Sequence, residues 1–293
     1  MPLSALLMVV VAGFIHACWN IVAKKAGGDV RFACFTSIVL MVFWAPVGLW
    51  VGWHQVPVWG WQEWGLIGIS GALHVVYYVS LLRGYRKAEL TVVYPLARGF
   101  GPLLSSLGAI VLLGEQISVI GLCGIAAVVF GVLLVAGGPD LFRDADDPRQ
   151  RAGLEKGVRY GLLTGVFIAS YTVVDGFGVK VLLLSPILID YFGNFVRLVF
   201  LVPPVLRRPA EALTLWKTQW KYATIVGIVS PIPYVLVLYA MQVAPLSHMA
   251  PAREVSMLFA ALLGGQLLGE SNRMVRFLGA TSIAVGVIAL SVG

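Results

Sequence analysis

The chain has 293 residues, of which 59% are hydrophobic and 12% are charged, and its mean hydropathy is +0.89. This composition excludes an ordinary soluble globular protein, because too few polar side chains remain to cover a water-exposed surface. The net charge of +7 does not indicate a nucleic-acid partner, because the basic residues fall in short segments between apolar runs. We therefore expect an integral membrane protein in contact with the lipid bilayer.

The apolar runs predict the number of membrane-spanning helices. A bilayer core of about 30 Å requires about 20 apolar residues per helix. The first run is expected to be a retained span rather than a signal peptide, because it lacks a basic n-region and a small-residue cleavage site. The sequence thus predicts an all-α polytopic membrane protein with ten spans, at residues 3–24, 32–52, 64–86, 89–113, 117–137, 157–179, 186–206, 220–242, 246–268 and 273–292.

The second half of the chain repeats the first. Since each repeat holds five spans, an odd number, the second repeat must enter the membrane from the opposite side, a construction common in secondary transporters. A shift of 155 or 156 residues aligns Arg98 with Arg253, Tyr78 with Tyr234, Pro95 with Pro251, and the Leu-Leu-Gly-Glu segment ending at Glu115 with the one ending at Glu270.

Three segments follow from this duplication: a five-helix repeat over 1–138, a charged cytoplasmic linker over 139–156 and a second five-helix repeat over 157–293. The odd-numbered connections, from the first to the ninth, hold 17 Lys and Arg residues, whereas the other side holds only Lys180. The positive-inside rule places those loops in the cytoplasm and both termini outside. We expect the bacterial inner (plasma) membrane as the location.

Polar side chains within the first and third spans are candidates for a substrate site, because ionisable groups inside a membrane cost about 2.5 to 3.5 kcal/mol each. His16 and Asn20 lie one helical turn apart, and His16 can take up a proton near neutral pH. The alternative for both is hydrogen bonding between helices. His74 and Tyr78, the latter repeated as Tyr234, suit either a cavity wall or packing with a satisfied hydroxyl.

Two arginines related by the repeat, Arg98 and Arg253, lie in the fourth and ninth spans. They must face protein or water, and they can bind carboxylate or phosphate groups. The alternative is a structural role in which they hold backbone carbonyls or Glu115 and Glu270. Tyr94 shares a helix face with Arg98, and Glu254 follows Arg253.

Prolines are expected to interrupt the helices that carry these groups. Pro95 should disrupt the first turn of the fourth span, and Pro231 and Pro233 should kink or break the eighth. Carbonyl groups freed there would line a cavity or serve as a hinge.

The sixth and seventh spans add further charged candidates. Asp175 can accept an ammonium group or a coupling proton, and the alternative is a buried pair with Arg197. Asp190, Asn194 and Arg197 share one helix face, with Asp190 near the outer end, where it is expected to be solvated.

In the fifth and tenth spans, pairs of glycines lie seven residues apart. They favour close approach of helices, either as scaffold in a monomer or as a homodimer contact. These are Gly124, Gly131, Gly279 and Gly286.

The cysteines and the sequence motifs indicate neither a metal site nor a catalytic site. Cys18, Cys34 and Cys123 lie in or near apolar runs without metal-ligand spacing. The chain carries no protease, hydrolase or nucleotide-binding motif. We therefore expect no cofactor, no metal and no enzymatic activity.

The chain resembles the drug/metabolite transporter superfamily and, more narrowly, its ten-helix EamA group. The resemblance rests on two five-span repeats, each of which has a proline, an arginine and a final Leu-Leu-Gly-Glu segment. The resemblance implies alternating access around a central cavity lined chiefly by spans 1, 3, 4, 6, 8 and 9, with export of small metabolites. Four-helix relatives that expel cationic drugs use a glutamate in the first span, where this chain offers His16 and Asn20.

We therefore predict a secondary active transporter that exports small amino acids or related anionic or zwitterionic metabolites, with protons as candidate coupling ions. The alternatives are a lipid scramblase or flippase, or a multidrug cation exporter of the same superfamily. In the main hypothesis the arginines meet the carboxylate of the substrate, and Asp175 or Glu254 meets its amine. The residues expected at the substrate site are His16, Asn20, His74, Tyr78, Tyr94, Arg98, Asp175, Asn194, Arg197, Tyr234, Arg253 and Glu254.

Overall fold

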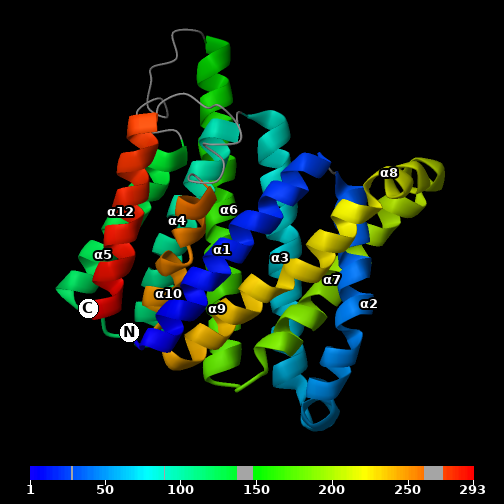
Figure 1. The fold of residues 1–293 in the computed structure, drawn as a ribbon, viewed down its shortest axis with the longest axis horizontal. Helices are drawn as coiled ribbons and strands as arrows, with labels where there is room; N and C mark the ends of the chain where they lie inside the picture. Colours follow the sequence, from blue (N-terminus) through cyan, green and yellow to red (C-terminus); the bar gives the residue numbers. More distant parts are fainter. Residues whose placement is uncertain (28, 89, 137–147, 261–272) are drawn as a thin grey trace.

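The computed structural model describes residues 1–27, 29–88, 90–136, 148–260 and 273–293. Within these ranges the chain folds as a bundle of α-helices without β-strands, which confirms the all-α prediction (Figure 1). The first half contains α1 (Leu3–Ala26), α2 (Val30–Gln55), the short 3-10 helix η1 (Val56–Val58), α3 (Trp61–Lys87), α4 (Leu90–Leu112) and α5 (Val119–Ala136). The second half contains α6 (Pro148–Lys180), α7 (Pro186–Leu206), α8 (Pro209–Val229), α9 (Pro231–Val243), α10 (Leu246–Ala252) and α12 (Arg273–Val292), and residues 255–260 are also helical.

These helices are compatible with the predicted ten spans. Seven segments are long and apolar enough to cross a membrane, and α8 and α9 together form one of them. Two shorter apolar helices lie at Val119–Val135 and Phe277–Val292. The remaining span begins with α10 and residues 255–260, and the rest of its predicted range, 261–268, lies outside the described residues.

Local sequence explains where several helices begin and end. The Asp29 carboxylate accepts hydrogen bonds from the backbone N–H groups of Arg31 and Phe32 at 2.8 and 3.4 Å, and so caps the start of α2. Gly27 ends α1 with φ 60°, and Gly114 follows α4 with φ 67°, a left-handed conformation that favours glycine. Pro186, Pro209 and Pro231 occupy first turns, where no backbone donor is needed.

The structure refines three predicted spans. The helix that contains the eighth span begins at Pro209, and it is interrupted at Ser230, directly before Pro231, as its prolines predict. The ninth span is not continuous, because a turn at Arg253 and Glu254 separates α10 from residues 255–260. The fourth span is not disrupted at Pro95, because α4 runs unbroken from Leu90 to Leu112. A proline near a helix start loses few hydrogen bonds there.

The repeated glycines bring α5 and α12 into close contact. A Cβ atom on Gly131 would lie 2.6 Å from the carbonyl oxygen of Gly279, and one on Gly286 would lie 2.8 Å from that of Gly124. Only glycine allows these two backbones to approach so closely. These glycines therefore make a contact within one chain, and the two helices stand side by side in Figure 1.

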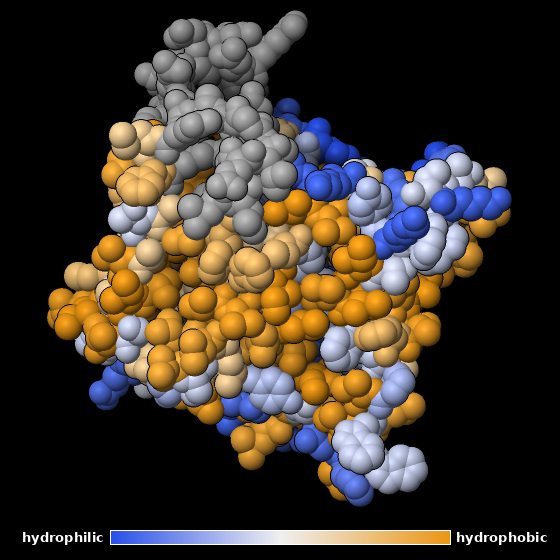
Figure 2. Space-filling model, in the orientation of Figure 1, coloured by the Kyte–Doolittle hydropathy of each residue, from blue (hydrophilic) through white to orange (hydrophobic). Residues whose placement is uncertain are grey.

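The two termini lie together at one end of the bundle (Figure 1). The amino group of Met1 donates a hydrogen bond to the carbonyl oxygen of Ser291 at 2.8 Å. Termini on the same side of the membrane are what an even number of spans requires. Figure 2 shows an apolar surface across the middle of the molecule, with hydrophilic residues gathered toward its ends, as expected for a bilayer-spanning protein.

Candidate functional site

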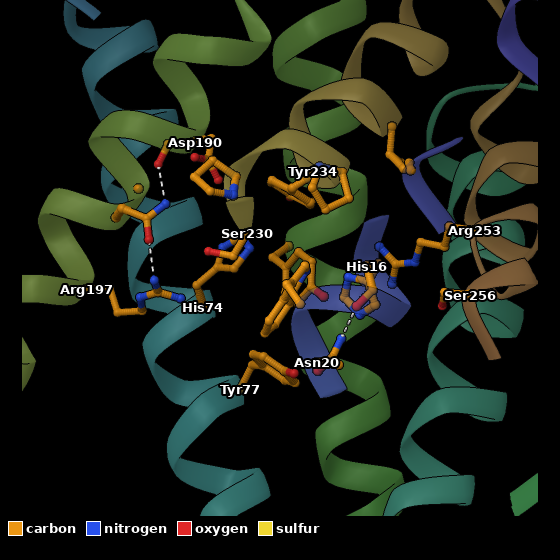
Figure 3. Close-up of a pocket in the computed structure, with 18 of the residues that line it drawn as sticks. His16, Asn20, His74, Tyr77, Asp190, Arg197, Ser230, Tyr234, Arg253 and Ser256 are labelled. Carbon is orange, nitrogen blue, oxygen red and sulfur yellow. Dashed lines mark hydrogen bonds between the residues drawn. The ribbon is translucent and has the colours of Figure 1, made fainter. Parts of the chain in front are cut away.

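A cavity of ≈ 380 Å³ lies between the two halves of the bundle. Its lining comes from α1, α3 and α4 of the first half and from α6, α7, α9 and the turn after α10 of the second, with Leu40 from α2. The predicted cavity helices are therefore all represented, and α7 contributes a further wall. The polar side chains gather at two ends, with aromatic rings between them (Figure 3).

The α7 wall carries Asp190, Asn194 and Arg197 on one face, as their spacing predicts. Arg197 donates to Oδ1 of Asn194 and to the hydroxyl of Ser37. The Asn194 amide donates to the backbone carbonyl of Asp190 at 2.8 Å. The Asp190 carboxylate forms no ion pair within the described ranges, and it lines the cavity wall.

The opposite end is organised by the break in the ninth span. Arg98 of α4 forms an ion pair with the Glu254 carboxylate at 2.8 Å and donates to the Ser256 hydroxyl at 3.0 Å. Arg253 lies 3.6 Å from the other Glu254 oxygen and donates to Thr172 at 3.3 Å. Glu254 is 1% exposed, so one buried carboxylate lies between two arginines from different repeats.

This end also includes α1. Figure 3 shows Arg253 projecting into the cavity on the same side as His16 and Ser256. Asn20 donates to the backbone carbonyl of His16 at 2.8 Å, which leaves its side-chain oxygen free for another donor. Gly13 allows α1 to approach this segment, because a Cβ atom there would lie 3.1 Å from the backbone nitrogen of Ser256.

Aromatic rings fill the space between the two ends. The His74 ring stacks on Tyr171 with centroids 4.0 Å apart, and it meets Tyr234 edge-on at 5.8 Å. The rings of Tyr77 and Tyr171 pack edge-on, with centroids 5.6 Å apart. The Tyr234 hydroxyl donates to the carboxylate of Asp175, which is 0% exposed and lies behind the wall. Tyr234 lies in the first turn of α9, directly after the break at Ser230.

Most of the residues predicted from the sequence line this cavity. The exceptions are Tyr78, Asp175 and Glu254. Asp175 and Glu254 lie directly behind lining residues, to which they are bonded, whereas Tyr78 lines a separate cavity. The predicted residues on the central cavity are His16, Asn20, His74, Tyr94, Arg98, Asn194, Arg197, Tyr234 and Arg253.

The alternative pairings expected for the charged residues are wrong where the structure describes them. Glu115 does not pair with either arginine, because it binds Lys180 at 2.8 Å and accepts from the N–H groups of Leu246 and Ser247. Asp175 bonds to Tyr234 rather than to Arg197. Glu270, the other carboxylate considered, lies outside the described residues.

Several lining residues were not among the predicted set. Asp190 was expected to be solvated near the outer end, although its spacing from Asn194 and Arg197 already placed it on their face. Ser230 could have been found because the 156-residue shift aligns it with His74. Trp19, Tyr77, Tyr85 and Tyr171 carry no sequence signal that distinguishes cavity lining from core packing.

No group of three or more His, Cys, Asp or Glu residues with metal-binding geometry is present in the part of the chain that the structure describes. The donor groups around the cavity are instead guanidinium, hydroxyl, imidazole and amide groups. This set suits hydrogen bonding to an organic ligand that carries an anionic group.

Comparisons with known proteins agree with this architecture. The model of the EamA-like transporter family matches residues 3–137 and 155–292. A solved crystal structure of a protein superposes with a TM-score of 0.73 at 14% sequence identity, covering 98% of each chain, which establishes a shared fold. Comparison with curated proteins gives no match.

Proposed function

Because the chain belongs to the EamA-like transporter family, we propose that it is a secondary active transporter that exports small amino acids or related anionic or zwitterionic metabolites by alternating access. A membrane-embedded polar cavity built from both repeats supports this proposal. Its volume of ≈ 380 Å³ lies near the lower end of the range of ligand pockets, about 300 to 1,000 Å³, and suits a small metabolite.

The distribution of charge around the cavity carries the proposal. Three guanidinium groups line it, at Arg98, Arg197 and Arg253, and Asp190 is its one lining carboxylate. Arg98 is neutralised by Glu254, but Arg253 keeps donors toward the cavity. The carboxylate of a small substrate would therefore lie near Arg253, with its side chain against the aromatic rings, and a substrate that carries a cationic group at its far end would place that group near Asp190.

The two helix breaks provide a physical basis for alternating access. Tyr234 directly follows the break between α8 and α9, and Arg253 lies in the turn after α10. Broken helices can change direction with fewer lost hydrogen bonds than continuous ones. A substrate carboxylate that engages Arg98 would compete with Glu254, and protonation of Glu254 or Asp190 would couple transport to a proton gradient.

Two other activities are less consistent with this cavity. Three lining arginines disfavour a lipophilic cation, because like charges repel in a medium of low dielectric constant. A scramblase needs a polar groove open to the bilayer, whereas these polar side chains are surrounded by helices of both repeats.

The experiment that tests the proposal measures exchange of radiolabelled amino acids in proteoliposomes. Arg253→Ala and Asp190→Asn should each lower transport about tenfold or more, since a charged hydrogen bond contributes about 1.5 to 3 kcal/mol. Arg208→Ala serves as the matched control, because this side chain is 69% exposed and lies away from the cavity. Full transport of amino acids by folded Arg253→Ala protein would rule out the proposed carboxylate site.

A further inference from the structure

A second cavity, of ≈ 280 Å³, lies between α2, α3 and α7, outside the substrate cavity. We call it the side groove. Most of its wall is apolar, with Val79 and Leu82 from α3 and Phe200 and Leu201 from α7. Val79 is 37% and Phe200 is 56% exposed, so this wall continues into the surface that faces the bilayer.

One end of the side groove carries positive charge. Arg83 and Arg86 line it from the last turns of α3, three residues apart and therefore on neighbouring positions of one helix face. Both side chains are exposed. Neither forms an ion pair within the residues that the structure describes, so two guanidinium groups stand beside an apolar groove without a protein anion.

Two acidic side chains near the lining residue Val30 are engaged elsewhere. Arg31, next to the lining residue Val30, forms ion pairs with Asp29 at 3.4 Å and with Glu211 at 2.6 Å. Glu211 also lies 3.5 Å from Arg208. Among the described residues, no carboxylate therefore forms an ion pair with Arg83 or Arg86, and both can bind an anion from outside the chain.

The inner end of the groove differs from its mouth. Tyr78 lines this end, and Arg197 lies between the groove and the substrate cavity, since it lines both. The guanidinium of Arg197 is held by Asn194 and Ser37. The two unengaged cations consequently lie at the mouth, and the apolar wall extends from them toward the middle of the membrane.

We propose that the side groove binds an anionic phospholipid, with its phosphate on Arg83 and Arg86 and an acyl chain along α3 and α7. Arginine pairs bind phosphate oxygens through paired hydrogen bonds, and basic pockets between helices near the membrane surface suit anionic headgroups. A free phosphate ion would use the arginines but leave the apolar wall without a partner. A neutral lipid would fill the wall but leave the two charges unpaired.

The test measures the apparent unfolding temperature of the purified protein in detergent during titration with phosphatidylglycerol, phosphatidylcholine or inorganic phosphate. A ligand that binds the folded state raises this temperature. Phosphatidylglycerol should stabilise the parent protein more than phosphatidylcholine does, and inorganic phosphate should have little effect. Equal stabilisation by phosphatidylcholine or by inorganic phosphate would overturn the proposal.

Variants locate the effect in the side groove. Arg83→Ala/Arg86→Ala should weaken phosphatidylglycerol binding at least tenfold. Lys217→Ala/Lys221→Ala removes the same charge from exposed positions on α8 outside the groove, and it should bind like the parent. Val79→Glu, which places a carboxylate on the apolar wall, provides a second variant that should also weaken binding. Parent-like binding by folded Arg83→Ala/Arg86→Ala protein would reject the site.

Discussion

At the scale of single residues, two carboxylates of this protein are neutralised by cations from the other repeat. Glu254 is 1% exposed and lies between Arg98 and Arg253. Glu115 follows the same rule outside the membrane-spanning helices, where it joins the loop after α4 to Lys180 and to the first N–H groups of α10. Carboxylates placed in this way link the two repeats, because each contacts partners from the other half.

Glu115 should make the stability of the folded protein depend on pH. Burial alone raises the pKa of its carboxyl, but hydrogen bonds from Lys180, Ser247 and Leu246 outweigh burial and hold the pKa below its ordinary value of 4.5. The stabilisation is therefore complete above pH 4.5, and it is lost as the pH falls through the lower pKa of the folded state. The apparent unfolding temperature in detergent should drop in this acidic range.

Glu115→Gln should lower the unfolding temperature at pH 7 by a few degrees and reduce the drop in the acidic range. The glutamine keeps an acceptor but loses the charge that strengthens bonds to Lys180 and to α10. Glu63→Gln is the control, since Glu63 accepts from the Gly60 N–H at an exposed helix start. An acid profile unchanged by Glu115→Gln would contradict the assignment.

At the scale of helices, the repeat is conserved in sequence but not in shape. α3 is continuous, whereas its counterpart is divided into α8 and α9, and α4 is continuous, whereas its counterpart is interrupted after α10. The outcome is visible at Tyr78 and Tyr234, which are equivalent in the repeat but line different cavities. By contrast, α5 and α12 pack against each other through their paired glycines.

Gly131→Ala should destabilise the protein through the α5–α12 contact. The added methyl group would lie 2.6 Å from the Gly279 carbonyl oxygen, so the helices must separate, at a cost of about 1 to 3 kcal/mol. Gly65→Ala is the matched control, because nothing lies within 4 Å of its added Cβ atom and alanine favours a helix. We expect a lower unfolding temperature only for Gly131→Ala, and equal shifts would show that the contact is unimportant.

At the scale of the whole molecule, basic residues concentrate at one end. The connections predicted to be cytoplasmic include Arg208, which is 69% exposed, and the opposite end includes the tryptophan-rich segment around Val58, which is 80% exposed. The positive-inside rule assigns these ends to opposite faces of the membrane.

Cysteine labelling tests this orientation. In a background with Cys18, Cys34 and Cys123 replaced by alanine, Val58→Cys should react with a membrane-impermeant maleimide on intact cells. Arg208→Cys should react only after permeabilisation. Comparable expression of both variants provides the control, and the reverse pattern of labelling would invert the assigned topology.

The sequence by itself determined the helical class, the spans and the duplication, because apolar run length and repeated residues are properties of the chain. Most of the site residues that it predicted also line the central cavity, such as Arg98, Arg253 and Asn194, since polar groups are too costly to face lipid. It predicted Tyr78 at the central cavity, where it does not lie, and it did not predict Asp190 there.

Only the tertiary structure decided which partner each charged group takes and which face each helix turns to the cavity. Glu115 binds Lys180 and α10, and Glu254 binds Arg98, although the sequence permits other pairings. Helix rotation and the sites of bending depend on packing against neighbours far away in the chain. Residue spacing defines which side chains share a helix face, but contacts between helices determine where that face points.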